Sequence, residues 1–189
     1  MSFRFPAEAA DTETAIDVVQ QAMSIMHQGP APFKWIDDDS KTLLGCFAPF
    51  SYTPEMCRQF FVCGKLAYGI QGVKPRNREL ALIGLCSVVD APFVVYSHRA
   101  IAIKIGISDE QFEDGIAGRI PEKLSDEERA AYRLGCVCAA LTGRLDDATW
   151  DEFSTKLDKT EIVGLLHVIG GYRWVSLLEQ VNGDYRKFS

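Results

Sequence analysis

The segment from Leu80 to Val89 limits the possible folds of this chain more than any other part of the sequence. It reads Leu-Ala-Leu-Ile-Gly-Leu-Cys-Ser-Val-Val, so a helix formed there is apolar on nearly every side. Such a helix has to be surrounded by other protein elements. No part of the chain shows the sustained two-residue alternation of a half-buried strand. The sequence therefore predicts an all-α fold, a helical bundle with this segment near its centre.

Helix-breaking residues follow this segment directly. Asp90-Ala91-Pro92 ends one helix and starts the next, which we expect to run to about Ile105 with Gly106 as its C-terminal cap. Residues 79–89 and 92–105 are thus predicted to form a central helix hairpin. Residues 72–77, just before it, are predicted to form a turn.

Capping residues mark the remaining helices. Ser108 with Gln111 and Ser125 with Glu128 both match the capping-box spacing. Further N-caps are predicted at three positions: Asp11, Thr53 before Pro54, and Thr160. Gly170-Gly171 lies inside the last predicted helix, which suggests a close helix crossing at that point.

Composition narrows the range of partners. The 189-residue chain has a net charge of −6 and a pI of about 5.1, which argues against nucleic acid or an anionic membrane as its partner. No stretch reaches the roughly 20 apolar residues of a membrane span. We therefore expect a cytoplasmic protein that binds a small molecule. Residues 1–40 are interpreted as an N-terminal helical arm and residues 41–189 as one helical domain.

The six cysteines include no Cys-x-x-Cys pair, so neither a zinc-knuckle nor a thioredoxin-like spacing is present. Most of them lie in apolar helical patterns, where a free cysteine behaves as a small buried hydrophobe. Of the three histidines, His27 lies in the arm. We expect neither a metal site nor a cofactor.

Glu79 and His98 are the principal candidates for chemistry. Each is a proton-handling group in an otherwise apolar helical segment. Taken singly, Glu79 could complement a helix dipole and His98 could be a core histidine. Brought together by the hairpin, a carboxylate and an imidazole can share a proton near neutral pH.

The residues around this pair resemble the carboxymuconolactone decarboxylase and AhpD-like superfamily. The resemblance is carried by Arg76-Asn77-Arg78-Glu79-Leu80, by His98 and by Gly106-Ile107-Ser108-Asp109-Glu110. A similar closing helix begins at Glu161-Ile162-Val163-Gly164-Leu165, and the likeness covers about residues 50–182. It implies an AhpD-like helical bundle, a homo-oligomer built from trimers, and pockets near subunit contacts.

One departure from this family bears on the chemistry. Its peroxidase-type members carry a Cys-x-x-Cys pair whose second cysteine lies four residues before the histidine. Ala91 and Val94 occupy those positions here. Hydroperoxide reduction of that type needs an attacking thiolate and a resolving thiol. The sequence therefore predicts that the chain is not a thiol peroxidase.

The function that this pattern favours is a cofactor-free lyase, decarboxylase-like, acting on a small and cyclic carboxylic acid. His98 would stabilise and protonate the enolate left by the loss of carbon dioxide, and Glu79 would orient it or act as the base. An isomerase, cyclase or dehydratase using the same pair, and a non-catalytic helical oligomer, are the alternatives. Tyr96, Arg99 and His167 are the weaker candidates for substrate binding.

Overall fold

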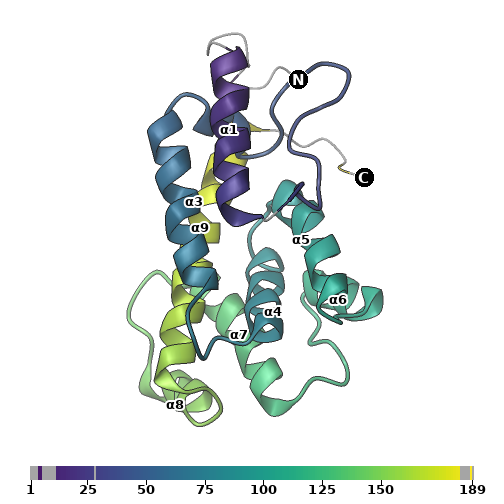
Figure 1. The fold of residues 1–189 in the computed structure, drawn as a ribbon. Coiled ribbons are helices and arrows are strands. Elements are labelled where there is room, and N and C mark those ends of the chain that lie inside the picture. The colour runs from purple at the N-terminus through teal and green to yellow at the C-terminus, as the bar shows by residue number, and fades with distance from the viewer. Residues whose placement is uncertain (1–3, 6–11, 28, 184–187, 189) are drawn as a thin grey trace.

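The computed structural model describes residues 4–5, 12–27, 29–183 and 188, and its regular elements in this part of the chain are α-helices (Figure 1). The described residues form no strand, and one isolated antiparallel bridge joins Ile36 and Leu43. The prediction of an all-α fold is confirmed. No helix in the described ranges is long and apolar enough to span a membrane.

Most helices follow one another with short connections, whereas a long connection separates α1 from α2. Their bounds are α1 Thr12–Met26, α2 Phe47–Phe50, α3 Pro54–Tyr68, α4 Pro75–Cys86, α5 Pro92–Lys104, α6 Asp109–Ile116, α7 Asp126–Ala140, α8 Asp147–Ser154 and α9 Lys159–Asn182. Helix α1 packs beside α3 at one end of the molecule, and α8 lies at the other end (Figure 1).

Helix α4 lies at the centre of this arrangement, as its composition predicts. It packs most extensively on α7, and it also contacts α5, α6 and α9. All residues of α4 from Leu80 to Leu85 are buried, including Gly84. The predicted turn at 72–77 is wrong in its second half, because α4 already begins at Pro75. Lys74 makes no side-chain cap there, so the local sequence carries no strong start signal beyond the proline.

Two glycines set the close approach of α4 and α7. A Cβ atom on Gly84 would lie 2.1 Å from the carbonyl oxygen of Tyr132, and one on Gly135 would lie 1.9 Å from that of Ala81. The predicted crossing at Gly170-Gly171 is wrong in its position. A Cβ atom on Gly170 would have no neighbour within 4 Å, and one on Gly171 would make an ordinary contact with Phe60.

The predicted helix starts have mixed outcomes. Both capping boxes are present, with Ser108 bonded to the backbone of Gln111 and Ser125 to that of Glu128. Thr53 occupies the N-cap position of α3 but makes no capping hydrogen bond through its side chain. The cap of α9 is Asp158 and not Thr160, since α9 already begins at Lys159. The predicted cap Asp11 lies outside the described residues.

The end of the molecule formed by α1, α2 and α3 is rich in aromatic side chains. Phe47 of α2 contacts Phe61 of α3 and Phe93 of α5, and Phe33 packs edge-on against Phe93. The start of α5 is held from α9, where the buried Glu179 accepts a hydrogen bond from the backbone N–H of Phe93. These contacts determine where α5, and with it His98, lies relative to α9.

Candidate active site

The helix hairpin brings Glu79 and His98 into direct contact. Glu79 lies one turn into α4 and is fully buried, and His98 on α5 is 5% exposed. Oε2 of Glu79 lies 2.7 Å from Nδ1 of His98. A carboxylate one turn inside a helix and fully removed from water is not there to serve the helix dipole. The contact between these two groups is therefore the centre of the candidate site.

A tyrosine from α9 completes the coordination of the imidazole. The hydroxyl of Tyr172 lies 2.7 Å from Nε2 of His98, and the two rings meet edge to face with centroids 4.7 Å apart. The Tyr172 hydroxyl is in turn 3.1 Å from the hydroxyl of Tyr68 on α3. Four side chains from four helices thus form one hydrogen-bonded chain: Glu79, His98, Tyr172 and Tyr68.

The direction of these hydrogen bonds follows from the partners. A carboxylate only accepts, so Nδ1 of His98 donates to Glu79, and in the neutral imidazole Nε2 then accepts from Tyr172. Burial raises the pKa of Tyr172, although the hydrogen bond from Tyr68 opposes this effect. Burial also raises the pKa of Tyr68 well above its ordinary value. Both phenols therefore keep their protons at neutral pH, and Tyr172 can donate to His98.

Arg78 supplies a positive charge next to this chain. Its Nε lies 3.6 Å from Oε1 of Glu79, and its guanidinium carbon lies 4.0 Å from the centre of the Tyr68 ring. Oε1 of Glu79 accepts no hydrogen bond from the described residues. Charge attraction to the nearly buried guanidinium is thus what offsets the burial of this oxygen.

A small cavity of about 70 Å³ lies beside His98. Its walls include Val94, Ser97 and His98 of α5, together with Tyr68, Tyr172 and several phenylalanines. His27, which follows α1, also lines it. Burial lowers the pKa of His27, and His98 and Lys104 lower it further. The sequence placed His27 in the arm and offered no signal that it would face His98.

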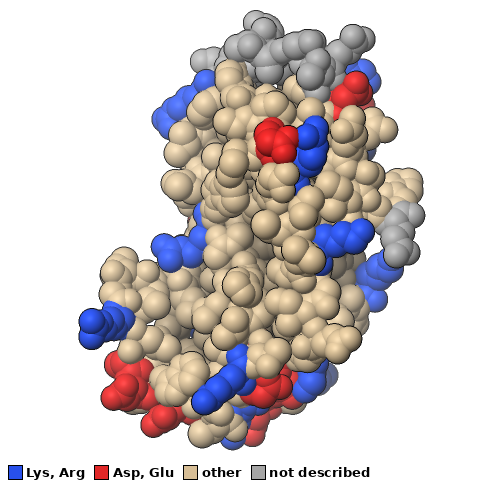
Figure 2. Space-filling model, turned by 60° about the vertical axis from the view of Figure 1, so that its left-hand side comes forward, with Lys and Arg blue, Asp and Glu red and all other residues tan. Residues whose placement is uncertain are grey.

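A larger groove of about 370 Å³ lies on the other side of Tyr172, between α3 and α9. From α3 it is lined by Phe60, Cys63, Leu66, Ala67 and Tyr68, and from α9 by His167, Val168, Gly171, Tyr172 and Trp174. Figure 2 brings this side of the molecule forward and shows a broad area without charged side chains in its middle, with charges gathered at the lower end.

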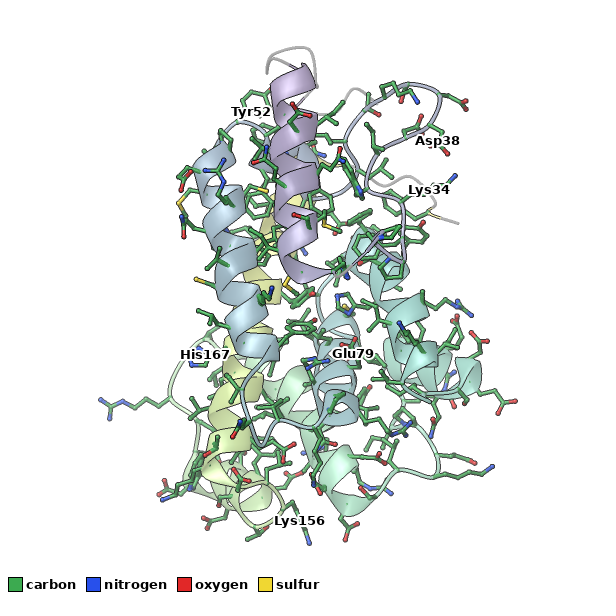
Figure 3. All side chains as sticks on the ribbon, in the orientation of Figure 1. Lys34, Asp38, Tyr52, Glu79, Lys156 and His167 are labelled. Atoms are coloured by element: carbon green, nitrogen blue, oxygen red, sulfur yellow. The ribbon has the colours of Figure 1, made fainter. Side chains whose placement is uncertain are left out.

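The three weaker candidates lie in different places. Of these three, only His167 lines the cavity or the groove, and it is an exposed residue of the groove. His167 lies at the outer edge of the molecule, whereas Glu79 lies toward its middle (Figure 3). The Tyr96 hydroxyl accepts a hydrogen bond from the backbone N–H of Lys34 at 3.1 Å. Arg99 is half-exposed and pairs with Asp109 and Glu113. The structure brings neither Tyr96 nor Arg99 to the Glu79–His98 pair.

Burial disfavours the thiolate form of two cysteines near the pair, Cys86 and Cys46. Burial raises the pKa of Cys86, and the negative charges of Glu179 and Glu79 add to this effect. Burial likewise raises the pKa of Cys46, which lines the small cavity, well above its ordinary value. Within the described ranges no three His, Cys, Asp or Glu side chains come together in a way that could hold a metal ion.

Neither a family model nor a curated protein sequence matches this chain. Among solved structures, the chain is similar to the debrominase Bmp8 in complex with 2,3,4-tribromopyrrole, with a TM-score of 0.67. The two are 11% identical, and the match covers 97% of this chain and 91% of the other. At that identity the likeness concerns the fold. The chain therefore shares its all-helical architecture, over nearly its whole length, with an enzyme that binds a small halogenated pyrrole.

Proposed function

We propose that this protein is a cofactor-free enzyme of the carboxymuconolactone decarboxylase and AhpD-like superfamily. It would act as a decarboxylase-like lyase on a small cyclic carboxylic acid, with Glu79 and His98 as its proton-transfer pair. The observation that carries the proposal is the buried 2.7 Å contact between Oε2 of Glu79 and Nδ1 of His98. Buried, paired ionisable groups beside a cavity are characteristic of acid–base sites.

The chemistry follows from this contact. When carbon dioxide leaves a β-keto-type acid, the electron pair of the broken C–C bond remains on the substrate as an enolate. A protonated His98 would donate a hydrogen bond to the developing oxyanion and then transfer a proton to carbon. Glu79 would pair with the imidazolium that this step requires, and Arg78 places a positive charge 3.6 Å from the second oxygen of that carboxylate.

A second candidate is an isomerase, cyclase or dehydratase that uses the same residues. It is favoured by the 2.7 Å contact between Nε2 of His98 and the Tyr172 hydroxyl, in which a neutral imidazole would accept from the phenol. A neutral imidazole with an accepting Nε2 is arranged as a general base. Such a site abstracts a proton first and does not require that carbon dioxide be lost.

The comparison supports the size class of the ligand. The debrominase of the same fold was captured with a five-membered ring compound. A bundle of this architecture can thus enclose a small flat ring, which agrees with the cyclic substrate proposed here. We also propose a homo-oligomeric state, supported by exposed apolar side chains of α9 outside the groove: Val163, Leu166, Leu177 and Val181.

The test is a substrate panel of cyclic β-keto acids and lactone carboxylic acids. Carbon dioxide release identifies a lyase, and deuterium uptake from D₂O without carbon loss identifies an isomerase or a related enzyme. Glu79→Gln and His98→Ala should each lower the turnover number by about 10²-fold or more. Full turnover in both variants would show that the pair is structural.

A further inference from the structure

The two spaces beside Tyr172 differ greatly in size. The cavity that His98 lines measures about 70 Å³, whereas the groove between α3 and α9 measures about 370 Å³. An apolar cavity of about 150 Å³ binds benzene, and ligand sites measure about 300–1,000 Å³. A ring compound therefore fits the groove and does not fit the cavity as it stands.

The wall between the two spaces contains the end of the hydrogen-bonded chain. Phe60, Tyr68 and Tyr172 line both the cavity and the groove. Of these three, Tyr172 has the hydroxyl that contacts Nε2 of His98. The buried pair is consequently connected to the groove through one phenol.

The lining of the groove indicates what it could bind. Apolar side chains such as Leu66, Val168 and Trp174 form most of its surface, and its lining contains no acidic residue. His167 is the one basic side chain of the described lining, and Tyr68 and Tyr172 are the members of the lining that carry hydroxyl groups. This combination suits a flat apolar ring with a carboxylate or carbonyl oxygen.

We propose that the α3–α9 groove is the substrate site, that it takes a small ring with a carboxylate or carbonyl group, and that Tyr172 is the catalytic residue that exchanges a proton with the substrate. This inference rests on the proposed function, because it assigns the substrate site and the proton-relaying tyrosine for the same Glu79–His98 pair. It differs from that proposal in placing His98 one hydrogen bond away from the substrate.

The proton step balances through two linked transfers. The Tyr172 hydroxyl proton passes to Nε2 of His98 while the substrate C–H proton passes to the Tyr172 oxygen, and the C–H electron pair remains on the substrate as an enolate. The imidazolium formed is paired with Glu79. The reverse transfers return a proton to carbon. In a decarboxylation no C–H proton is removed first. The imidazole of His98 takes up a proton from solvent, and the reverse transfers then carry a proton through Tyr172 to the carbon that has lost carbon dioxide.

The location of the ligand can be tested without any substitution. Cys63 lines the groove and is exposed, whereas Cys46 lines the cavity and is buried. With benzoate as the probe, we expect at least about 5-fold slower alkylation of Cys63 by iodoacetamide at saturation. The assignment is overturned if bound benzoate leaves the alkylation rate of Cys63 unchanged. It is also overturned if Cys63 does not react even without benzoate, because a second copy of the chain then covers the groove.

Two matched variants reduce the volume of the groove and of the cavity, respectively. Ala67→Leu adds volume in the groove, and Ser97→Val adds volume in the cavity. We expect Ala67→Leu to weaken benzoate binding by about 10-fold or more and Ser97→Val to change it by less than about 3-fold, as measured by tryptophan fluorescence. The opposite pattern would place the ring beside His98 and contradict the proposal. Circular dichroism checks that both variants keep their helices.

The role of Tyr172 is tested with Tyr172→Phe and the cyclic β-keto acid cyclohexanone-α-carboxylate. We expect kcat for carbon dioxide release to fall about 10²-fold, with benzoate affinity changed by less than about 3-fold. Tyr68→Phe, which removes only the outer hydroxyl of the chain, should cost less than about 10-fold. If His98→Ala abolishes turnover and Tyr172→Phe does not, the relay is wrong and the proposed function stands. If His98→Ala and Glu79→Gln both keep full turnover, the proposed function itself fails.

Discussion

The Tyr172 hydroxyl lies 2.7 Å from Nε2 of His98, on the side of the imidazole opposite to Glu79. Both ring nitrogens are therefore engaged, one by a carboxylate from α4 and the other by a phenol from α9. This double contact holds the imidazole in a single orientation and determines which nitrogen carries the proton. The arrangement resembles the logic of a nucleophile–histidine–carboxylate triad, with a phenol in the outer position.

Glu79→Gln should lower stability as well as activity. It leaves the nearly buried Arg78 without its nearest negative charge, and breaking a buried pair in this way costs about 3 kcal/mol. Arg78→Met combined with Glu79→Gln removes both charges and should recover at least half of that loss. Urea unfolding measures the recovery. Activity should stay low in the double variant, and a parallel recovery of turnover would show that Glu79 acts through stability alone.

Replacing glycine by alanine should have opposite effects on stability at the close crossing of α4 and α7 and on the exposed part of α9. Gly135→Ala places a Cβ atom against the Ala81 carbonyl and should destabilise the fold by about 3 kcal/mol. Gly170→Ala meets no neighbour within 4 Å on an exposed part of α9 and should stabilise by up to about 1 kcal/mol. Thermal unfolding of both variants measures the contrast. A neutral Gly135→Ala would mean that α4 and α7 can separate freely.

The N-cap residues of α7 and α3 are predicted to contribute differently to stability. Ser125→Ala removes a side chain that accepts a hydrogen bond from the backbone of Glu128 and should cost about 1 kcal/mol. Thr53→Ala removes no capping hydrogen bond and should cost less than about half of that. Chemical denaturation of the two variants gives the comparison. Equal losses would show that Thr53 contributes through contacts other than a cap.

His27 predicts a pH effect on stability. Burial holds its pKa below 6.5, so the unfolded chain takes up a proton before the folded protein does. Stability is thus unaffected above about pH 6.5 and falls as the pH decreases below it. His27→Gln should reduce the loss of melting temperature between about pH 7 and pH 5. An unchanged slope in the variant would mean that His27 does not contribute to the acid sensitivity.

The cysteines predict a chemical result. Cys86 is partly buried and its pKa is raised by burial, so it is a poor thiolate source at neutral pH. Cys86→Ser should therefore keep at least about half of the wild-type turnover. The protein with a dithiol donor should not consume hydroperoxide. Rapid peroxide consumption that Cys86→Ser abolishes would overturn the assignment of the site to proton transfer.

Several features could be predicted from the sequence because their causes are local. The apolar run predicts a surrounded helix, which is correct from Leu80 to Leu85, whereas the predicted extension to Val89 is wrong because α4 ends at Cys86 and Val88 is exposed. The serine boxes at Ser108 and Ser125 predict two helix starts. The break at Pro92 predicts the hairpin that joins Glu79 to His98. Each signal depends on residues close together in the chain, so no knowledge of the packing is needed.

Other features depend on how distant helices meet. Tyr172 is 74 residues from His98 in the chain, and it reaches the imidazole only because α9 crosses α5. His27 faces the same cavity only because α1 packs beside α3. The glycines of the close crossing, Gly84 and Gly135, were also not distinguished from Gly170-Gly171 by sequence alone. Only the side chains of the facing helix decide which glycine has no room for a Cβ atom.

The sequence by itself thus determined the helical class, the central hairpin and the two residues at its contact. Hydrophobic period, proline breaks and capping boxes act over one or two helical turns, and a family-like motif is a local pattern as well. The tertiary structure alone decided that the pair extends through Tyr172 to a groove large enough for a ring. That extension depends on the side-chain packing of α3, α5 and α9 together, which no single segment specifies.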